Sequence, residues 1–99
     1  GIHQIRKETE YKAAILYQAL EQSKVASPFV HNTAFRSNTV MVAQCDGHTE
    51  SIAKALAAQG MQPGDGYGKF KSTQLRFANF PTHSKEQYEQ LVDTLAALG

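Results

Sequence analysis

The sequence predicts an α/β (α+β) domain, in which a small mixed or antiparallel sheet carries helices mainly on one face, in the order α-β-α-β-β-α. Two long segments, at the ends of the chain, repeat apolar residues at the spacing of a helix. Short runs rich in β-branched and aromatic residues lie between them, and Gly and Pro residues separate these runs. Because 99 residues suffice for one small core, we expect residues 1–99 to form a single domain.

The first expected element is a helix from about Ile2 to Ser23. Its apolar residues Ala13, Leu16, Tyr17 and Leu20 recur at i, i+3, i+4 and i+7, so they share one face of the helix. The chain enters this long amphipathic helix directly, and we therefore expect it to be a fragment of a longer protein.

A strand and a second helix are expected next. Thr39–Ala43 is rich in β-branched residues and should form a strand that ends at the Asp46-Gly47 turn. The helix is expected over Thr49–Gln59, with Thr49 as its N-cap and Gly60 as its C′ residue.

Two further strands are expected around a glycine-rich turn at residues 61–68. The pattern predicts a short strand over Tyr67–Phe70 and a longer one over Gln74–Phe80. Pro81 cannot extend a central strand, so the second of these should end there.

The last expected element is a helix that runs to about Leu98. Ser84 and Gln87 fit the S-x-x-Q capping box that starts a helix. The apolar stripe of this helix consists of Tyr88, Leu91, Val92, Leu95 and Leu98.

Composition excludes several classes of partner. A net charge of +1 gives no electrostatic attraction for nucleic acid or for an anionic membrane surface, and the apolar runs are too short to span a bilayer. The four histidines lack metal-ligand spacing, so no metal site is expected. Cys45 is the only cysteine, so no internal disulfide is possible and a reducing cytoplasm is the expected compartment.

Arg76 is the main candidate for a binding residue. Its neighbours are apolar, so it should lie in a half-buried strand, on the face opposite Leu75 and Phe77. A guanidinium in that setting needs an anionic partner, and its planar fork suits a carboxylate bound through two hydrogen bonds. The alternative is a structural salt bridge to an acidic side chain or to a helix end.

Other candidates have plainer interpretations beside them. Arg36 could line a cleft, although an exposed or salt-bridged arginine is the default. Lys69 and Lys71 alternate with Phe70, as on an exposed strand edge. Cys45 follows an apolar strand, where free cysteines are usually inert. The residues alone therefore indicate no self-sufficient catalytic set.

Three stretches cover nearly the whole chain: GIHQIRKETEYKAAILYQAL, RSNTVMVA and GYGKFKSTQLRFANFPTHSKEQYEQLVDTL. They resemble the C-terminal small domain of class V (fold type I) aminotransferases of the phosphoserine aminotransferase type. The most specific part of the resemblance is the segment RFANFPTHS beside the final helix.

The resemblance implies an enzyme of serine biosynthesis that uses pyridoxal 5′-phosphate to move an amino group between an amino acid and a 2-oxo acid, with phosphoserine and 2-oxoglutarate as substrates. Arg76 occupies the place of the family's arginine for the substrate α-carboxylate. The Schiff-base lysine and the cofactor pocket belong to the large domain of the same chain, which forms homodimers. The resemblance therefore implies no catalytic or cofactor-binding residue here, and a fragment that is inactive and cofactor-free by itself.

Two alternatives stay open at this point. Phosphoserine aminotransferases carry a Gly-His-Arg segment that contacts the substrate phosphate, where this chain has Gly68-Lys69-Phe70. Lys69 could meet a phosphate as a point charge, but the spelling GYGKFK also resembles alanine–glyoxylate and serine–glyoxylate aminotransferases. The other alternative is a free-standing, non-catalytic binding or dimerisation module that uses a hydrophobic helix face.

Overall fold

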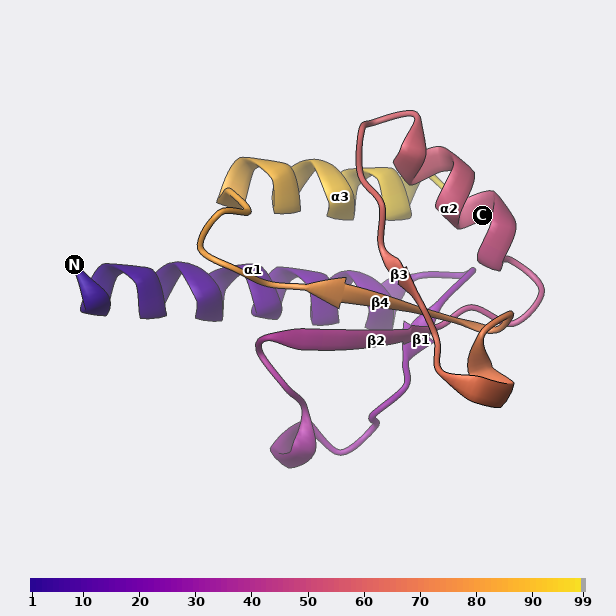
Figure 1. Ribbon diagram of the computed structural model, residues 1–99, viewed down its shortest axis with the longest axis horizontal. Coiled ribbons are helices and arrows are strands. Elements are labelled where there is room, and N and C mark those ends of the chain that lie inside the picture. The colour runs from indigo at the N-terminus through magenta and orange to yellow at the C-terminus, as the bar shows by residue number, and fades with distance from the viewer. Residues whose placement is uncertain (99) are drawn as a thin grey trace.

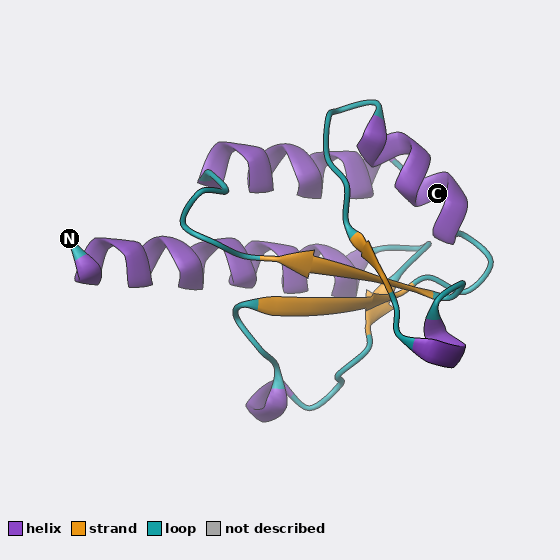
Figure 2. Cartoon of the chain, in the orientation of Figure 1, coloured by secondary structure: helices purple, strands orange, loops and turns teal. Residues whose placement is uncertain are grey.

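The computed structural model describes residues 1–98 and contains three α-helices, two short 3-10 helices and one four-stranded antiparallel sheet (Figures 1 and 2). The strand order in the sheet is β1-β2-β4-β3. In chain order the elements are α1 (Ile2–Gln22), β1 (Ser27–Pro28), η1 (Thr33–Phe35), β2 (Val40–Gln44), α2 (Thr49–Ala57), β3 (Gly64–Asp65), η2 (Gly68–Phe70), β4 (Gln74–Ala78) and α3 (Lys85–Ala97).

The helices cover one face of the sheet, which confirms the predicted fold class. β2 and β4 pair so that Met41 lies opposite Phe77, and both side chains are buried against the helices. Figure 1 shows α1 behind these central strands and α3 running alongside it. On the other face Val42 lies opposite Arg76, and both are only half-buried because no helix in the described part of the chain covers them.

The core lies between the sheet and the three helices. Each helix supplies leucines or isoleucine to it at helical spacing, as the periodicity of the sequence predicts. The fully buried large aliphatic side chains are Leu16 and Leu20 of α1, Ile52 and Leu56 of α2, Met41 of β2, Leu75 of β4 and Leu95 of α3.

The start of α3 has the predicted capping box. The Ser84 hydroxyl accepts a hydrogen bond from the backbone N–H of Gln87 at 3.1 Å, and the Gln87 side chain accepts one from the backbone N–H of Ser84 at 2.8 Å. Two donors that every helix start leaves unpaired are thereby satisfied.

The start of α2 corrects one expectation. The N-cap is His48, not Thr49, and it makes no side-chain capping bond. The Thr49 hydroxyl instead donates back to the Cys45 carbonyl. At the other end Gly60 has a φ of +81°, but it is not the C′ residue: the C-cap is Ala58, so Gly60 lies one position beyond C′.

The glycine-rich segment corrects a second expectation. Tyr67–Phe70 was predicted to be a strand, but Gly68–Phe70 is a 3-10 helix and the strand is the earlier pair Gly64–Asp65. Gly68 has a φ of +54°, which interrupts an extended chain. Gly66 passes so close to the Phe70 carbonyl that an added Cβ would lie 2.3 Å from its oxygen. This contact folds the segment back on itself.

The loop before β2 also contains pairing that the sequence pattern did not predict. Ser27–Pro28 forms the two-residue edge strand β1 beside Gln44 and Ala43 of β2. So short a strand has no room for a detectable alternation of apolar residues. Across residues 1–98, no helix has the length and hydrophobicity that crossing a membrane demands.

Candidate functional site

Arg76 projects from the middle of β4 on the face that no helix covers. Its neighbours in the strand, Leu75 and Phe77, are buried on the opposite side, as the alternation predicts. The Arg76 Nε–H donates to the backbone carbonyl of Asp65 in the neighbouring strand β3, and Nη1 donates to the Tyr67 hydroxyl at 2.8 Å. The guanidinium carbon lies 3.9 Å from the centre of the Tyr67 ring.

These partners of Arg76 are all uncharged. Within residues 1–98 the single ion pair joins Arg36 to Glu21, so the alternative of a structural salt bridge at Arg76 is not observed. A half-buried guanidinium held only by neutral groups has no counter-charge among these partners. The arrangement suits a site for an anionic ligand.

Arg36 has a different environment, which ties it to the first helix. Its Nη2 lies 3.5 Å from a carboxylate oxygen of Glu21, and its Nε donates to the Val30 carbonyl at 2.8 Å. The guanidinium also stacks over the Tyr17 ring at 4.9 Å. The salt-bridged interpretation of Arg36 is the one that these contacts support.

Lys69 lies in η2 and is exposed, with its ammonium 5.2 Å from the centre of the Phe70 ring. It lines a shallow hollow of about 600 Å³ between the start of α2 and the η2 turn, together with Lys71 and Asp65. No hydrogen bond or ion pair in the described part of the chain joins Lys69 or Arg36 to Arg76. The three predicted site residues therefore do not form one cluster by direct contact.

Lys12, the buried lysine of α1, was not predicted from the sequence. Its side chain is 1% exposed, and its ammonium donates to the carbonyls of Phe80 at 2.9 Å and His83 at 2.6 Å. Burial lowers the pKa of Lys12, and Glu8 opposes this shift weakly. A lysine beside Ala13 on an apolar face is a signal that could have been noticed.

Asn79 reinforces the same turn between β4 and α3. Its side-chain amide donates to the carbonyls of Thr9 at 2.9 Å and Asn38 at 2.7 Å. Asn79 and Lys12 therefore both attach the segment that follows β4 to α1.

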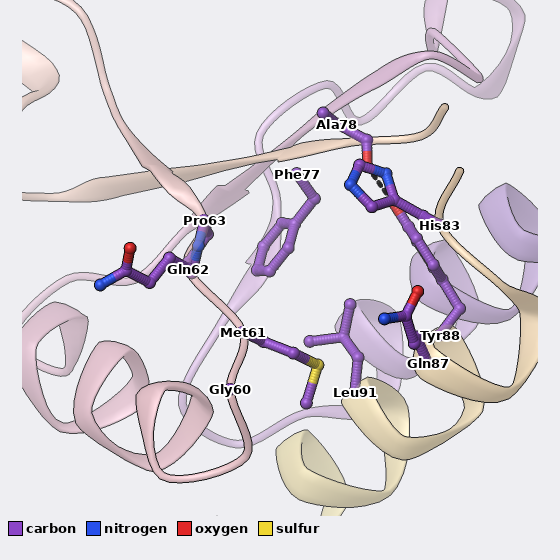
Figure 3. Close-up of a pocket in the computed structure, with 10 residues that line it drawn as sticks. All are labelled: Gly60, Met61, Gln62, Pro63, Phe77, Ala78, His83, Gln87, Tyr88 and Leu91. Carbon is purple, nitrogen blue, oxygen red and sulfur yellow. Dashed lines mark hydrogen bonds between the residues drawn. The ribbon is translucent and has the colours of Figure 1, made fainter. Parts of the chain in front are cut away.

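A small pocket lies on the helix side of the sheet, away from Arg76. It encloses about 170 Å³ between the α2–β3 loop, β4 and α3. Figure 3 shows Met61, Phe77 and Leu91 pointing into it, with His83 at its edge. The Tyr88 hydroxyl donates to the Ala78 carbonyl, and burial raises the pKa of Tyr88 to about 12, so this phenol stays protonated at neutral pH.

Cys45 is a buried free cysteine immediately after β2. Burial raises the pKa of the Cys45 thiol to about 11, which opposes formation of the nucleophilic thiolate. No cluster of three or more His, Cys, Asp or Glu residues that could hold a metal ion occurs among residues 1–98.

A sheet covered by helices on one face, with a neutral-partnered arginine on the other, agrees with the predicted class: a small domain of a fold type I aminotransferase. Comparisons with known proteins narrow this class. The solved structure of a phosphoserine aminotransferase from Cytophaga hutchinsonii matches with a TM-score of 0.87 and 46% sequence identity, over 96% of this chain and 27% of that one.

Curated sequences agree with the structural match. Phosphoserine aminotransferases from Rhodococcus opacus and Rhodococcus jostii are each 32% identical over 97 residues, which is 96% of this chain and 26% of each relative. The chain thus spans about a quarter of the length of the curated relatives it matches. No family model matches the chain. The predicted resemblance to phosphoserine aminotransferases is confirmed.

Proposed function

We propose that the chain is the C-terminal small domain of a class V aminotransferase that moves an amino group from phosphoserine to 2-oxoglutarate in serine biosynthesis. Its main contribution to the reaction is Arg76, which binds the α-carboxylate of the substrate. The observation that carries the proposal is the half-buried guanidinium of Arg76, held only by neutral partners on the uncovered face of the sheet. Similarity to phosphoserine aminotransferases over 96% of the chain supports it.

The chemistry of Arg76 follows from its free donors. A guanidinium has five N–H groups, and two of them bind Asp65 and Tyr67, which leaves three on Nη1 and Nη2. A carboxylate that binds through two parallel hydrogen bonds is fixed in direction as well as in place. Such a contact orients the Cα–H bond of an amino acid for proton removal.

Pyridoxal 5′-phosphate supplies the electron sink for amino transfer when it is bound to an aminotransferase. The lysines among residues 1–98 do not suit its attachment. Lys12 is the buried one, and its ammonium is bound to two backbone carbonyls, while the other six lysines, among them Lys69 and Lys71, are exposed on the surface. We therefore assign the cofactor to the large domain of a longer chain.

The uncovered face of the sheet suits contact with that large domain. Beside Arg76 it presents Val40, Val42 and Ala78, all of which are at least partly exposed in residues 1–98. A face of this kind, part apolar and part charged, is typical of a contact between domains of one chain. The proposal extends to a homodimeric, cytoplasmic enzyme.

The proposal is tested on the full-length gene product, supplied with pyridoxal 5′-phosphate. We expect glutamate to form from phosphoserine and 2-oxoglutarate, and no comparable transfer from alanine or serine to glyoxylate. Preference for glyoxylate would instead assign the chain to the alanine–glyoxylate or serine–glyoxylate aminotransferases. This alternative is tested because Lys69 and Phe70 stand where phosphoserine aminotransferases have a His-Arg pair. No transfer with either pair would leave a non-catalytic binding module.

A further inference from the structure

We infer that Tyr67 is a positioning residue, which holds the Arg76 guanidinium so that its outer edge, formed by Nη1 and Nη2, faces the substrate carboxylate. This inference rests on the proposed function and adds a residue to it. Tyr67 acts through Arg76 and has no assigned contact with the reacting atoms.

The contacts around Arg76 select which of its edges a carboxylate can use. Carboxylates bind arginine either side-on, through Nε and one terminal nitrogen, or end-on, through both terminal nitrogens. The Nε–H of Arg76 is already bound to the Asp65 carbonyl, so the side-on edge is closed. The end-on edge is the one that remains for a ligand.

Tyr67 restricts the guanidinium in two further ways. Its ring lies under the guanidinium carbon at 3.9 Å, and its hydroxyl accepts from Nη1 at 2.8 Å. A free arginine side chain has many rotamers, and fixing them at the moment of binding costs affinity. Tyr67 and Asp65 impose this order before the substrate arrives.

The partners orient Arg76 without neutralising it. A carboxylate in the place of Tyr67 would hold the guanidinium as firmly, but it would compete with the substrate for the same charge. A phenol and a backbone carbonyl leave that charge available. Arg76, with its neutral partners, therefore differs from Arg36, whose guanidinium forms an ion pair with Glu21.

Tyr67 is also poorly suited to a purely structural role. It is 71% exposed and belongs to no part of the buried core. Gly64, across the sheet from Arg76, leaves room for this arrangement, because a Cβ there would lie 3.1 Å from Nη2. Replacing Tyr67 should therefore change the freedom of Arg76 far more than the stability of the domain.

The experiment compares Tyr67→Leu and Tyr67→Phe with the wild-type full-length enzyme. Tyr11→Leu is the matched control, because it makes the same change at a tyrosine of α1 that bonds Glu89. Steady-state kinetics give KM and kcat for phosphoserine. Inhibition by O-phosphoethanolamine, which lacks the α-carboxylate, reports on the rest of the site.

We expect Tyr67→Leu to raise the KM for phosphoserine roughly tenfold, and Tyr67→Phe, which keeps the ring, to raise it about threefold. The inhibition constant of O-phosphoethanolamine and the kinetics of Tyr11→Leu should stay within about twofold of wild type. A general loss of structure would instead weaken both phosphoserine and O-phosphoethanolamine.

Two results would overturn the inference alone: an active enzyme in which Tyr67→Leu leaves the phosphoserine KM unchanged, or one in which the KM and the inhibition constant rise together. A wild-type enzyme that transfers no amino group from phosphoserine would overturn the proposed function, and this inference with it.

Discussion

Replacing Lys12 with Met should loosen the turn between β4 and α3. The Lys12 ammonium makes two charge-assisted hydrogen bonds to the carbonyls of Phe80 and His83, and Met fills a similar volume without a donor. Losing two such bonds costs about 3–6 kcal/mol. The lowered pKa of Lys12 indicates that burial disfavours its charge, so removing that charge offsets part of the destabilisation. We expect a net local destabilisation of about 2 kcal/mol.

Hydrogen exchange of the full-length protein measures this effect at the turn itself. A loss of 2 kcal/mol corresponds to roughly 30-fold faster exchange of the backbone amides of residues 79, 80 and 82–84. Lys7→Met is the matched control, because Lys7 is exposed on the same helix, and it should leave exchange within about twofold of wild type. Equal exchange in the two variants would refute the argument that the ammonium of Lys12 holds the turn.

Two other changes test the core and the glycine-rich segment. Burial raises the pKa of the Cys45 thiol from 9.0 to about 11. Between these two pH values the folded state keeps the thiol proton, whereas the unfolded state releases it. Stability should therefore be lost between pH 9 and 11 by up to about 3 kcal/mol relative to Cys45→Ala, and urea unfolding of both proteins at pH 8 and pH 11 measures that difference. A pH-independent difference would contradict the buried thiol. Gly66→Ala places a Cβ 2.3 Å from the Phe70 carbonyl oxygen and should cost about 2–4 kcal/mol, seen as a lower midpoint in thermal unfolding. An unchanged midpoint would mean that the segment folds differently.

The elements that the sequence predicted best are those that local interactions define. The period of Ala13, Leu16, Tyr17 and Leu20 forms one helix face regardless of what packs against it, and α1 extends over Ile2–Gln22. The capping box is equally local, since its two residues lie within one turn of a helix.

The elements that were mispredicted depend on close backbone contacts and on strand pairing, which residue propensities do not report. Gly66 tolerates only hydrogen next to the Phe70 carbonyl, and Gly68–Phe70 forms a 3-10 helix where β-propensity predicted a strand. β3 exists only because Gly64 and Asp65 pair with β4, and neither residue favours strands by itself.

The orientation of Arg76 could be predicted from the local sequence, but its contacts could not. Alternation along Leu75-Arg76-Phe77 was enough to predict that Arg76 faces away from the core. The partners of its guanidinium could not be predicted, because Asp65 contributes a backbone carbonyl and Tyr67 follows a strand that was misplaced. Lys12 bonds to carbonyls 68 and 71 positions away, and no local pattern reveals such a pairing.

The most direct test of the central claim is the KM of the full-length enzyme for phosphoserine after Arg76→Lys. Lysine keeps the charge but cannot form two parallel hydrogen bonds to the carboxylate, so we expect a KM raised more than about tenfold. Arg6→Lys, at an exposed position of α1, serves as the control and should leave the KM within about twofold of wild type. An unchanged KM in Arg76→Lys would show that Arg76 does not bind the substrate carboxylate.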